Sequence, residues 1–205
     1  MNDKTATCTL GARLPAISRR EEFLDAARTL ISRSGVKATS MRDLAREVGV
    51  TEGALYRHFK SKDEIVSELF SSEASRLHDW LGRSIAGAED GWGQLDALVR
   101  GFVVYGFEEA DSFRLIMELH EVAGASIRPG VRMPKEHFIA ILGRIARSEG
   151  WKMEKPVLVV FMVVGMLNRL IAGVRAMGAE DDREKTVKLA LRVTRAIVST
   201  AAEAV

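Results

Sequence analysis

A short stretch of the chain, Thr51–Lys62, gathers side chains that bind anions. It reads TEGALYRHFKSK and holds a tyrosine, an arginine, a histidine and two lysines, whereas only Leu55 and Phe59 look like core residues, four positions apart on one helical face. A free-standing helix gains nothing from Gly53, which costs it about 1 kcal/mol relative to alanine. Small residues at positions 53 and 54 would instead let the backbone come close to DNA. The chemistry that this stretch favours is therefore the noncovalent binding of a polyanion.

Two predicted helices position these side chains. Ser40 can cap a helix that ends at Val48, Gly49 breaks it, and Thr51 can cap a second helix that runs to Phe59. A helix, a glycine-containing turn and a second helix form the helix-turn-helix layout, whose second helix enters the major groove of DNA. Its first residues then face the base edges, and its flanks face phosphates.

The rest of the chain predicts an all-α protein. A capping box at Ser18 opens a helix that Gly35 should end, and another at Ser61 opens a long helix. Further helical patterns cover about 95–110, 112–124, 135–148, 156–177 and 181–204, and no strand-like alternation is found. We expect a tail over residues 1–17, a DNA-binding domain over 18–62 and a helical domain for effector binding and dimerisation over 63–205.

Composition and charge agree with this division. The 205 residues are 47% hydrophobic and 28% charged, which is ordinary for a globular protein. The whole chain has a net charge of only +2, but the segment from Ser18 to Lys62 carries ten Lys or Arg against six Asp or Glu. This uneven distribution suggests that an anionic partner binds to the N-terminal part of the chain. A single cysteine, Cys8, excludes an internal disulfide and fits a reducing compartment.

The sequence also predicts a cytoplasmic protein without a membrane partner. No secretory signal is visible in the first residues. The strongest apolar run, Val157–Leu167, is shorter than the roughly 20 residues that cross a bilayer.

The segment from Met41 to Leu69 resembles the N-terminal signature of the TetR family of one-component transcriptional regulators, and the resemblance covers roughly Ser18–Leu69. The matching positions are Ala45, Gly49, Val50, Gly53, Leu55, Tyr56, His58, Phe59, Lys60, Lys62 and Asp63. The remainder of the chain is compatible with the family in length and helicity.

This resemblance implies roles for individual residues. It implies that Arg42, Glu52, Gly53, Ala54 and Arg57 lie near bases, and that Ser40, Thr51, Tyr56, His58 and Lys62 contact the DNA backbone. Arginine pairs best with guanine O6 and N7. For Glu52 two interpretations stay open, an acceptor for a cytosine amine or a favourable charge at the helix N-terminus. Lys60 is either a phosphate contact or a solvated side chain.

Apolar residues in the second half are candidates for an effector pocket, although most such residues form ordinary core. The candidates are Phe102, Phe113, Met117, His120, Phe138, Phe161, Met162, Met166 and Asn168. Methionine and aromatic walls suit an apolar ligand. Asn168 and Arg169 interrupt the most apolar helix, so they could meet an effector, another subunit or water.

The same residues give no support for a metal, a cofactor or catalysis. Glu118, His120 and Glu121 cannot share one helical face, and the sequence has no His-x₃-His pair or cysteine cluster. It also lacks a glycine-rich nucleotide loop and a Gly-x-Ser-x-Gly elbow.

Together these observations predict a ligand-responsive repressor that binds a palindromic operator as a homodimer. The last two helices, 156–177 and 181–204, are the expected dimer contact, as a four-helix bundle, because the first is apolar nearly all round. The alternative is a helical small-molecule-binding enzyme or carrier with a vestigial DNA-binding head.

Overall fold

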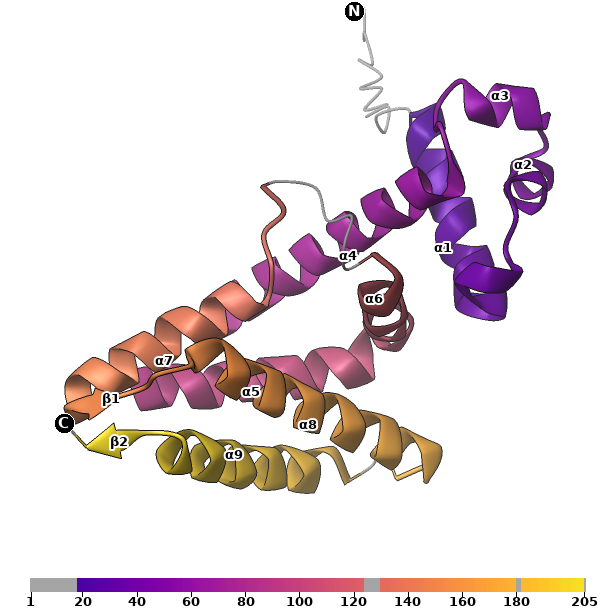
Figure 1. The fold of residues 1–205 in the computed structure, drawn as a ribbon. Helices are drawn as coiled ribbons and strands as arrows, with labels where there is room; N and C mark the ends of the chain where they lie inside the picture. The colour runs from indigo at the N-terminus through magenta and orange to yellow at the C-terminus, as the bar shows by residue number, and fades with distance from the viewer. Residues whose placement is uncertain (1–17, 124–129, 180–181, 205) are drawn as a thin grey trace, which may run out of the picture.

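A computed structural model describes residues 18–123, 130–179 and 182–204, and it is almost entirely helical, as the sequence predicts (Figure 1). The predicted tail and its Cys8 lie outside the described residues. The elements are α1 (Arg19–Ala38), α2 (Met41–Val48), α3 (Glu52–Tyr56), α4 (Lys62–Ile85), α5 (Gly91–Glu108), α6 (Ala110–Ala123), α7 (Lys135–Glu149), β1 (Trp151–Lys152), α8 (Pro156–Ala176), α9 (Arg183–Thr200) and β2 (Glu203–Ala204).

Helices α1, α2 and α3 form a small head at one end of the molecule (Figure 1). The predicted capping box is present, because the Ser18 hydroxyl accepts from the Glu21 N–H at 3.2 Å. Phe23, Leu55 and Phe59 are each at most 1% exposed and hold the head together. Gly35 interrupts the first helix, as predicted, because its φ of +80° and ψ of 163° are not helical. Helical turns resume after it and continue to Ala38, so two helical segments meet at a kink.

Helix α4 leads from the head into the body, where it packs against α5 and α6 (Figure 1). The expected domain boundary at residue 62 therefore falls in the first turn of an unbroken helix. A fully buried carboxylate, Glu73, ties α4 to its neighbours. It accepts from Arg28 Nε of α1 at 2.8 Å and from the Ser112 hydroxyl of α6 at 2.7 Å.

The body also contains a short sheet that the sequence does not predict, beside an apolar helix that it does predict. Trp151–Lys152 pairs antiparallel with Glu203–Ala204. The sequence predicts that the last helix runs to residue 204, but α9 stops at Thr200 and the two-residue strand β2 follows it. Helix α8 spans 21 residues, with a mean hydropathy of 2.3 over an 18-residue window. The helix predicted over 156–177 is therefore confirmed. Judged as a whole, and not by the run Val157–Leu167 alone, it is long and apolar enough to cross a membrane, a criterion that core helices also meet.

Candidate DNA-binding surface and effector cavity

Local hydrogen bonds and one glycine fix the two ends of α2 and the turn that leads to α3. The Ser40 hydroxyl accepts from the Asp43 N–H at 3.2 Å and starts α2, while Gly49 ends it in the left-handed region, with φ 72° and ψ 34°. The Val50 N–H then bonds to the Ala45 carbonyl at 2.9 Å. Glycine is favoured at such a helix end because it has no Cβ to clash.

Helix α3 and the residue after it present some of the predicted DNA contacts on an exposed surface. The Thr51 hydroxyl accepts from the Ala54 N–H at 3.2 Å, which fixes the start of the helix. Leu55 is fully buried, and it anchors α3 so that Tyr56 is 50% exposed and Arg57 also faces solvent. The helix is shorter than predicted, because it ends at Tyr56 instead of Phe59.

Two candidate base-reading residues contact each other. Arg42 Nε lies 3.1 Å from Glu52 Oε1, and the Arg42 side chain is 81% exposed. Glu52 thus stands in the first turn of α3 and next to an arginine of α2. This arrangement agrees with a role at the helix N-terminus, and it also orients Arg42 toward the outer face of the head.

Two candidate backbone contacts are held inside the head. The His58 ring is partly buried, and its centroid lies 5.2 Å from that of Phe23. Lys62 Nζ donates to the carbonyls of Val36 at 3.0 Å and Thr39 at 3.2 Å. Lys62 therefore neutralises the C-terminal end of α1 in the free protein, where carbonyls lack helical partners. Lys60, in contrast, is exposed.

Arg20 is a structural residue that sequence reasoning missed. Its guanidinium donates to Glu64 at 3.1 Å and to the His58 carbonyl, and it stacks 4.0 Å from the centre of the Phe59 ring. Its hydrogen bond with Glu68 raises the pKa of Arg20. These contacts fix α3 against α1 and α4. No local spacing could reveal them, since the partners lie 38 to 48 residues away.

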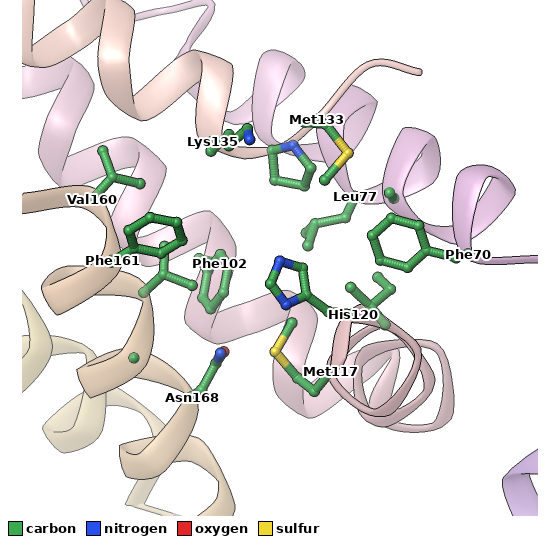
Figure 2. Close-up of a pocket in the computed structure, with 15 residues that line it drawn as sticks. Phe70, Leu77, Phe102, Met117, His120, Met133, Lys135, Val160, Phe161 and Asn168 are labelled. Atoms are coloured by element: carbon green, nitrogen blue, oxygen red, sulfur yellow. The ribbon is translucent and has the colours of Figure 1, made fainter. Parts of the chain in front are cut away.

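The body contains an apolar cavity of about 210 Å³ between α4, α5, α6 and α8 (Figure 2). Five of the predicted pocket residues line it, namely Phe102, Met117, His120, Phe161 and Asn168. Figure 2 shows the His120 ring near the middle of the lining residues, with Asn168 and Met117 beside it. Sequence reasoning missed Lys135, which lies at the other side of the cavity.

A second, larger cavity of about 590 Å³ lies against the first. Phe113 lines it, together with Met117, His120 and Asn168, which border both cavities. The remaining candidates line neither. Phe138 is buried in the core against Phe102, with ring centroids 6.2 Å apart. Met166 is partly buried, and Met162 is 52% exposed on the outside of α8.

Among the residues that the structure describes, no group of three or more His, Cys, Asp or Glu side chains could hold a metal ion.

Asp43 lies on the outer face of α2, and hydrogen bonds from Ser40 lower the pKa of its carboxyl.

Residues 23–69 match the family model described as "Bacterial regulatory proteins, tetR family". The HTH-type transcriptional repressor KstR2 of Mycolicibacterium smegmatis is 44% identical over 64 residues, which are 31% of this chain and 29% of that protein. The HTH-type transcriptional activator FasR of the same organism is 28% identical over 141 residues, 68% of this chain and 64% of that protein. The chain thus spans about a third of the KstR2 relative and less than two thirds of FasR.

Solved structures are similar over most of the chain. The ketosteroid transcriptional regulator KstR2 of Mycobacterium tuberculosis has a TM-score of 0.62 at 18% identity and covers 87% of this chain and 95% of its own. A TetR family transcription regulator from Marinobacter aquaeolei has a TM-score of 0.69 at 18% identity, over 87% and 94%. At this identity the likeness concerns the fold.

Proposed function

We propose that this chain, which belongs to the tetR family of bacterial regulatory proteins, is a ligand-responsive transcriptional repressor that binds a palindromic operator as a homodimer. The observation that carries the proposal is the exposed face of α3. Tyr56 and Arg57 face solvent there, and the buried Leu55 and Phe59 hold the helix in place. An exposed helix face of this kind fits the major groove of DNA, where Arg57 would contact bases and Thr51 would contact phosphate.

Dimerisation is proposed through α8 and α9. Only 33% of the most apolar window of α8 is buried within one protomer. Leu158, Phe161 and Met162 are each more than half exposed, and Leu189 of α9 is 40% exposed. A second copy that covers these side chains would form a four-helix bundle and remove apolar surface from water. Two heads would then face half-sites about 34–36 Å apart or a multiple of that distance.

Release from DNA is proposed to follow from ligand binding in the cavities of the body. Both cavities border α6, and the first also borders α4, which leads to the head. A ligand changes DNA affinity only if it prefers one head arrangement over the other, and a nearly complete switch needs about 5.5 kcal/mol of such preference. A small effector that displaces α4 would make the heads mismatch the half-sites.

The test is duplex DNA binding by the full chain, with sites selected from random duplexes. We expect selection of a palindrome, and affinity that falls steeply with salt as phosphate contacts release counterions. Arg57→Ala should relax base preference at one position of each half-site, at a cost of about 1–3 kcal/mol. Arg83→Ala, which removes an exposed arginine of the body, is the matched control and should change nothing.

A protein that ignores duplex DNA at low salt would contradict the proposal. If that protein also turned over a small molecule, the alternative of a helical enzyme or carrier with a vestigial head would hold instead.

A further inference from the structure

We propose that the apolar cavity of about 210 Å³ binds an uncharged, mainly hydrocarbon effector with one hydrogen-bond donor, and that Asn168 Oδ1 accepts from this donor. The inference rests on the proposed function, because it names the chemical class of the effector of the same regulatory site. It adds one polar group to the apolar effector that the sequence predicts.

The wall of this cavity favours hydrocarbon. It is built mostly from aromatic, aliphatic and methionine side chains, among them Phe70, Leu77, Phe102, Met117 and Phe161. Transfer of apolar groups of a ligand from water to such a wall drives binding. An apolar cavity of about 150 Å³ holds a benzene molecule. The larger cavity of this protein therefore suits one ring with a short side chain.

One polar atom of the wall is kept away from water without a partner. Among the described lining residues, His120, Lys135 and Asn168 have polar side chains. His120 and Lys135 are exposed, so water can satisfy their polar atoms. Asn168 Oδ1 is buried and has no hydrogen-bond partner in the described part of the chain. Because buried acceptors almost always have a partner, this oxygen favours a bound molecule that donates to it.

The amide of Asn168 can turn this oxygen toward the cavity. In Figure 2 the amide points toward the other lining residues, from the side opposite to Lys135. No described residue bonds to Asn168 Nδ2 either, so no hydrogen bond fixes the orientation of the amide. The last torsion of an asparagine side chain is broad and roughly two-fold, so rotation about it exchanges the oxygen and the nitrogen without moving α8. A ligand donor selects the orientation in which Oδ1 faces the cavity.

The same features disfavour charged ligands. A carboxylate end only accepts hydrogen bonds, so it cannot pair with Oδ1. An ammonium end donates, but no Asp or Glu is among the described residues that line the cavity, so the charge would be buried without a counter-ion. The class that fits is an uncharged molecule with a hydroxyl or N–H group.

A water molecule is a poor substitute for such a ligand. Buried waters usually make about three hydrogen bonds, whereas the wall around Asn168 is mostly apolar. A ligand that displaces a weakly held water replaces its hydrogen bond and adds apolar contact, so it gains affinity.

The test uses the full-length protein and a set of probes that share one ring and one propyl group, namely propylbenzene, 4-propylphenol, 4-propylanisole, 4-propylbenzoate and 4-propylbenzylammonium. Calorimetric titration at neutral pH, where the phenol is uncharged, gives each affinity. We expect 4-propylphenol to bind about three- to tenfold more tightly than propylbenzene, because a neutral hydrogen bond contributes on that scale. The anisole, which accepts but does not donate, should bind no more tightly than propylbenzene, and the two ions should bind least.

Variants assign the contact to the amide. Asn168→Leu keeps the approximate size of the side chain and should lower the affinity for 4-propylphenol to that for propylbenzene. Because it removes an unpaired buried oxygen, its thermal unfolding should occur at the same temperature or a higher one. Lys135→Met, at the opposite and exposed side of the cavity, is the matched control and should keep the preference for the phenol.

Several results would overturn the inference. Equal affinity for propylbenzene and 4-propylphenol, or no binding of any probe, would remove the donor class. Tightest binding of the anisole or the benzoate would do the same, because neither donates. If Asn168→Leu keeps the preference for the phenol, the amide does not bind the donor. If that variant is also monomeric in sedimentation, the amide belongs to the contact between subunits.

Operator binding, measured in parallel, separates this inference from the proposed function. If the protein binds an operator but only ligands without a donor release it, the repressor proposal stands and this inference fails. If the protein ignores DNA yet prefers the phenol through Asn168, the ligand class stands and the repressor proposal fails.

Discussion

Glu118 Oε1 accepts a hydrogen bond from the Val36 N–H at 2.9 Å, across 82 residues of sequence. It joins α6 of the body to the bend near the end of α1, where a Cβ on Gly35 would lie 3.1 Å from the same oxygen. Met117 and His120, on either side of Glu118 in sequence, border the cavities. Helix α6 therefore borders both cavities and contacts the head.

Glu118→Ala should weaken the coupling between the cavities of the body and the head. The variant leaves the N–H of the buried Val36 without its acceptor, so the free energy of unfolding should fall by about 1–3 kcal/mol. The effector should also change operator affinity less than in the unmodified protein. Urea unfolding and DNA titration with and without effector measure both effects, and Glu118→Gln, which keeps an acceptor, should restore most of each. An unaltered effector response in the alanine variant would exclude this contact from the coupling.

Two glycines of the head should respond in opposite ways to alanine. Gly49 has a φ of 72°, so Gly49→Ala should destabilise the protein by about 1–2 kcal/mol. Gly53 has no such backbone, and a new Cβ would meet only the Thr51 hydroxyl at 4.0 Å. Gly53→Ala should stabilise the free protein by up to about 1 kcal/mol and weaken operator binding, because the methyl group faces DNA. Thermal unfolding and DNA titration of both variants test these predictions. Normal operator binding by Gly53→Ala would contradict the proposed contact between Gly53 and DNA.

Two lysines separated by one residue should differ in how much their replacement lowers the stability of the protein. Lys62→Met removes the donor to the Val36 and Thr39 carbonyls and should lower stability by about 1 kcal/mol or more. Lys60→Met removes the same charge from an exposed position, so its stability should stay within about 0.5 kcal/mol. If Lys60 contacts phosphate, its loss should weaken all DNA sequences alike and reduce the salt dependence of binding. Equal stability of the two variants would contradict the capping role of Lys62.

The sequence predicts the local parts of this molecule well. The caps at Ser18, Ser40, Thr51 and Ser61 are all present, because each depends on residues three positions apart. Contacts between distant segments could not be predicted in this way. Arg20 and Lys62 find their partners only after α1, α3 and α4 have packed, and the same holds for the short strand that closes the body. Composition likewise could not separate Phe161, which lines the cavity, from its neighbour Met162, which does not, although both are more than half exposed.

A charge on the outside of α8 should prevent dimerisation. Met162 is 52% exposed and lines neither of the two cavities described above, so Met162→Glu should leave the protomer folded. Analytical ultracentrifugation should give a monomer, and operator affinity should fall by a large factor while weak nonspecific binding persists. Ala140→Glu on the exposed face of α7 is the control and should remain dimeric. A dimeric Met162→Glu protein would place the interface elsewhere.

The body should lose stability in mild acid through His137, which lies beside a second histidine. The rings of His78 in α4 and His137 in α7 lie 4.1 Å apart, near Asp79 and Glu136. Burial, and then the charge of His78, lower the pKa of His137. The folded state therefore binds fewer protons than the unfolded state, so stability should be complete above the unfolded pKa of about 6.5 and fall as pH drops below it. Urea titrations across this range should show a smaller decrease for His137→Gln.

Helix α4 is one rigid rod of 24 residues, about 36 Å long at 1.5 Å per residue. The apolar cavity borders α4 at Phe70, Ala74 and Leu77, so the lever from Ala74 to the start of the helix at Lys62 is about 18 Å long. A pivot of about 10° at Ala74 carries the head roughly 3 Å sideways, on the scale of a single base-pair step. In a two-fold pair the displacement is doubled, because symmetry moves both heads in opposite directions. Under the proposed function, such a movement inside the body would shift the two heads out of register with the operator.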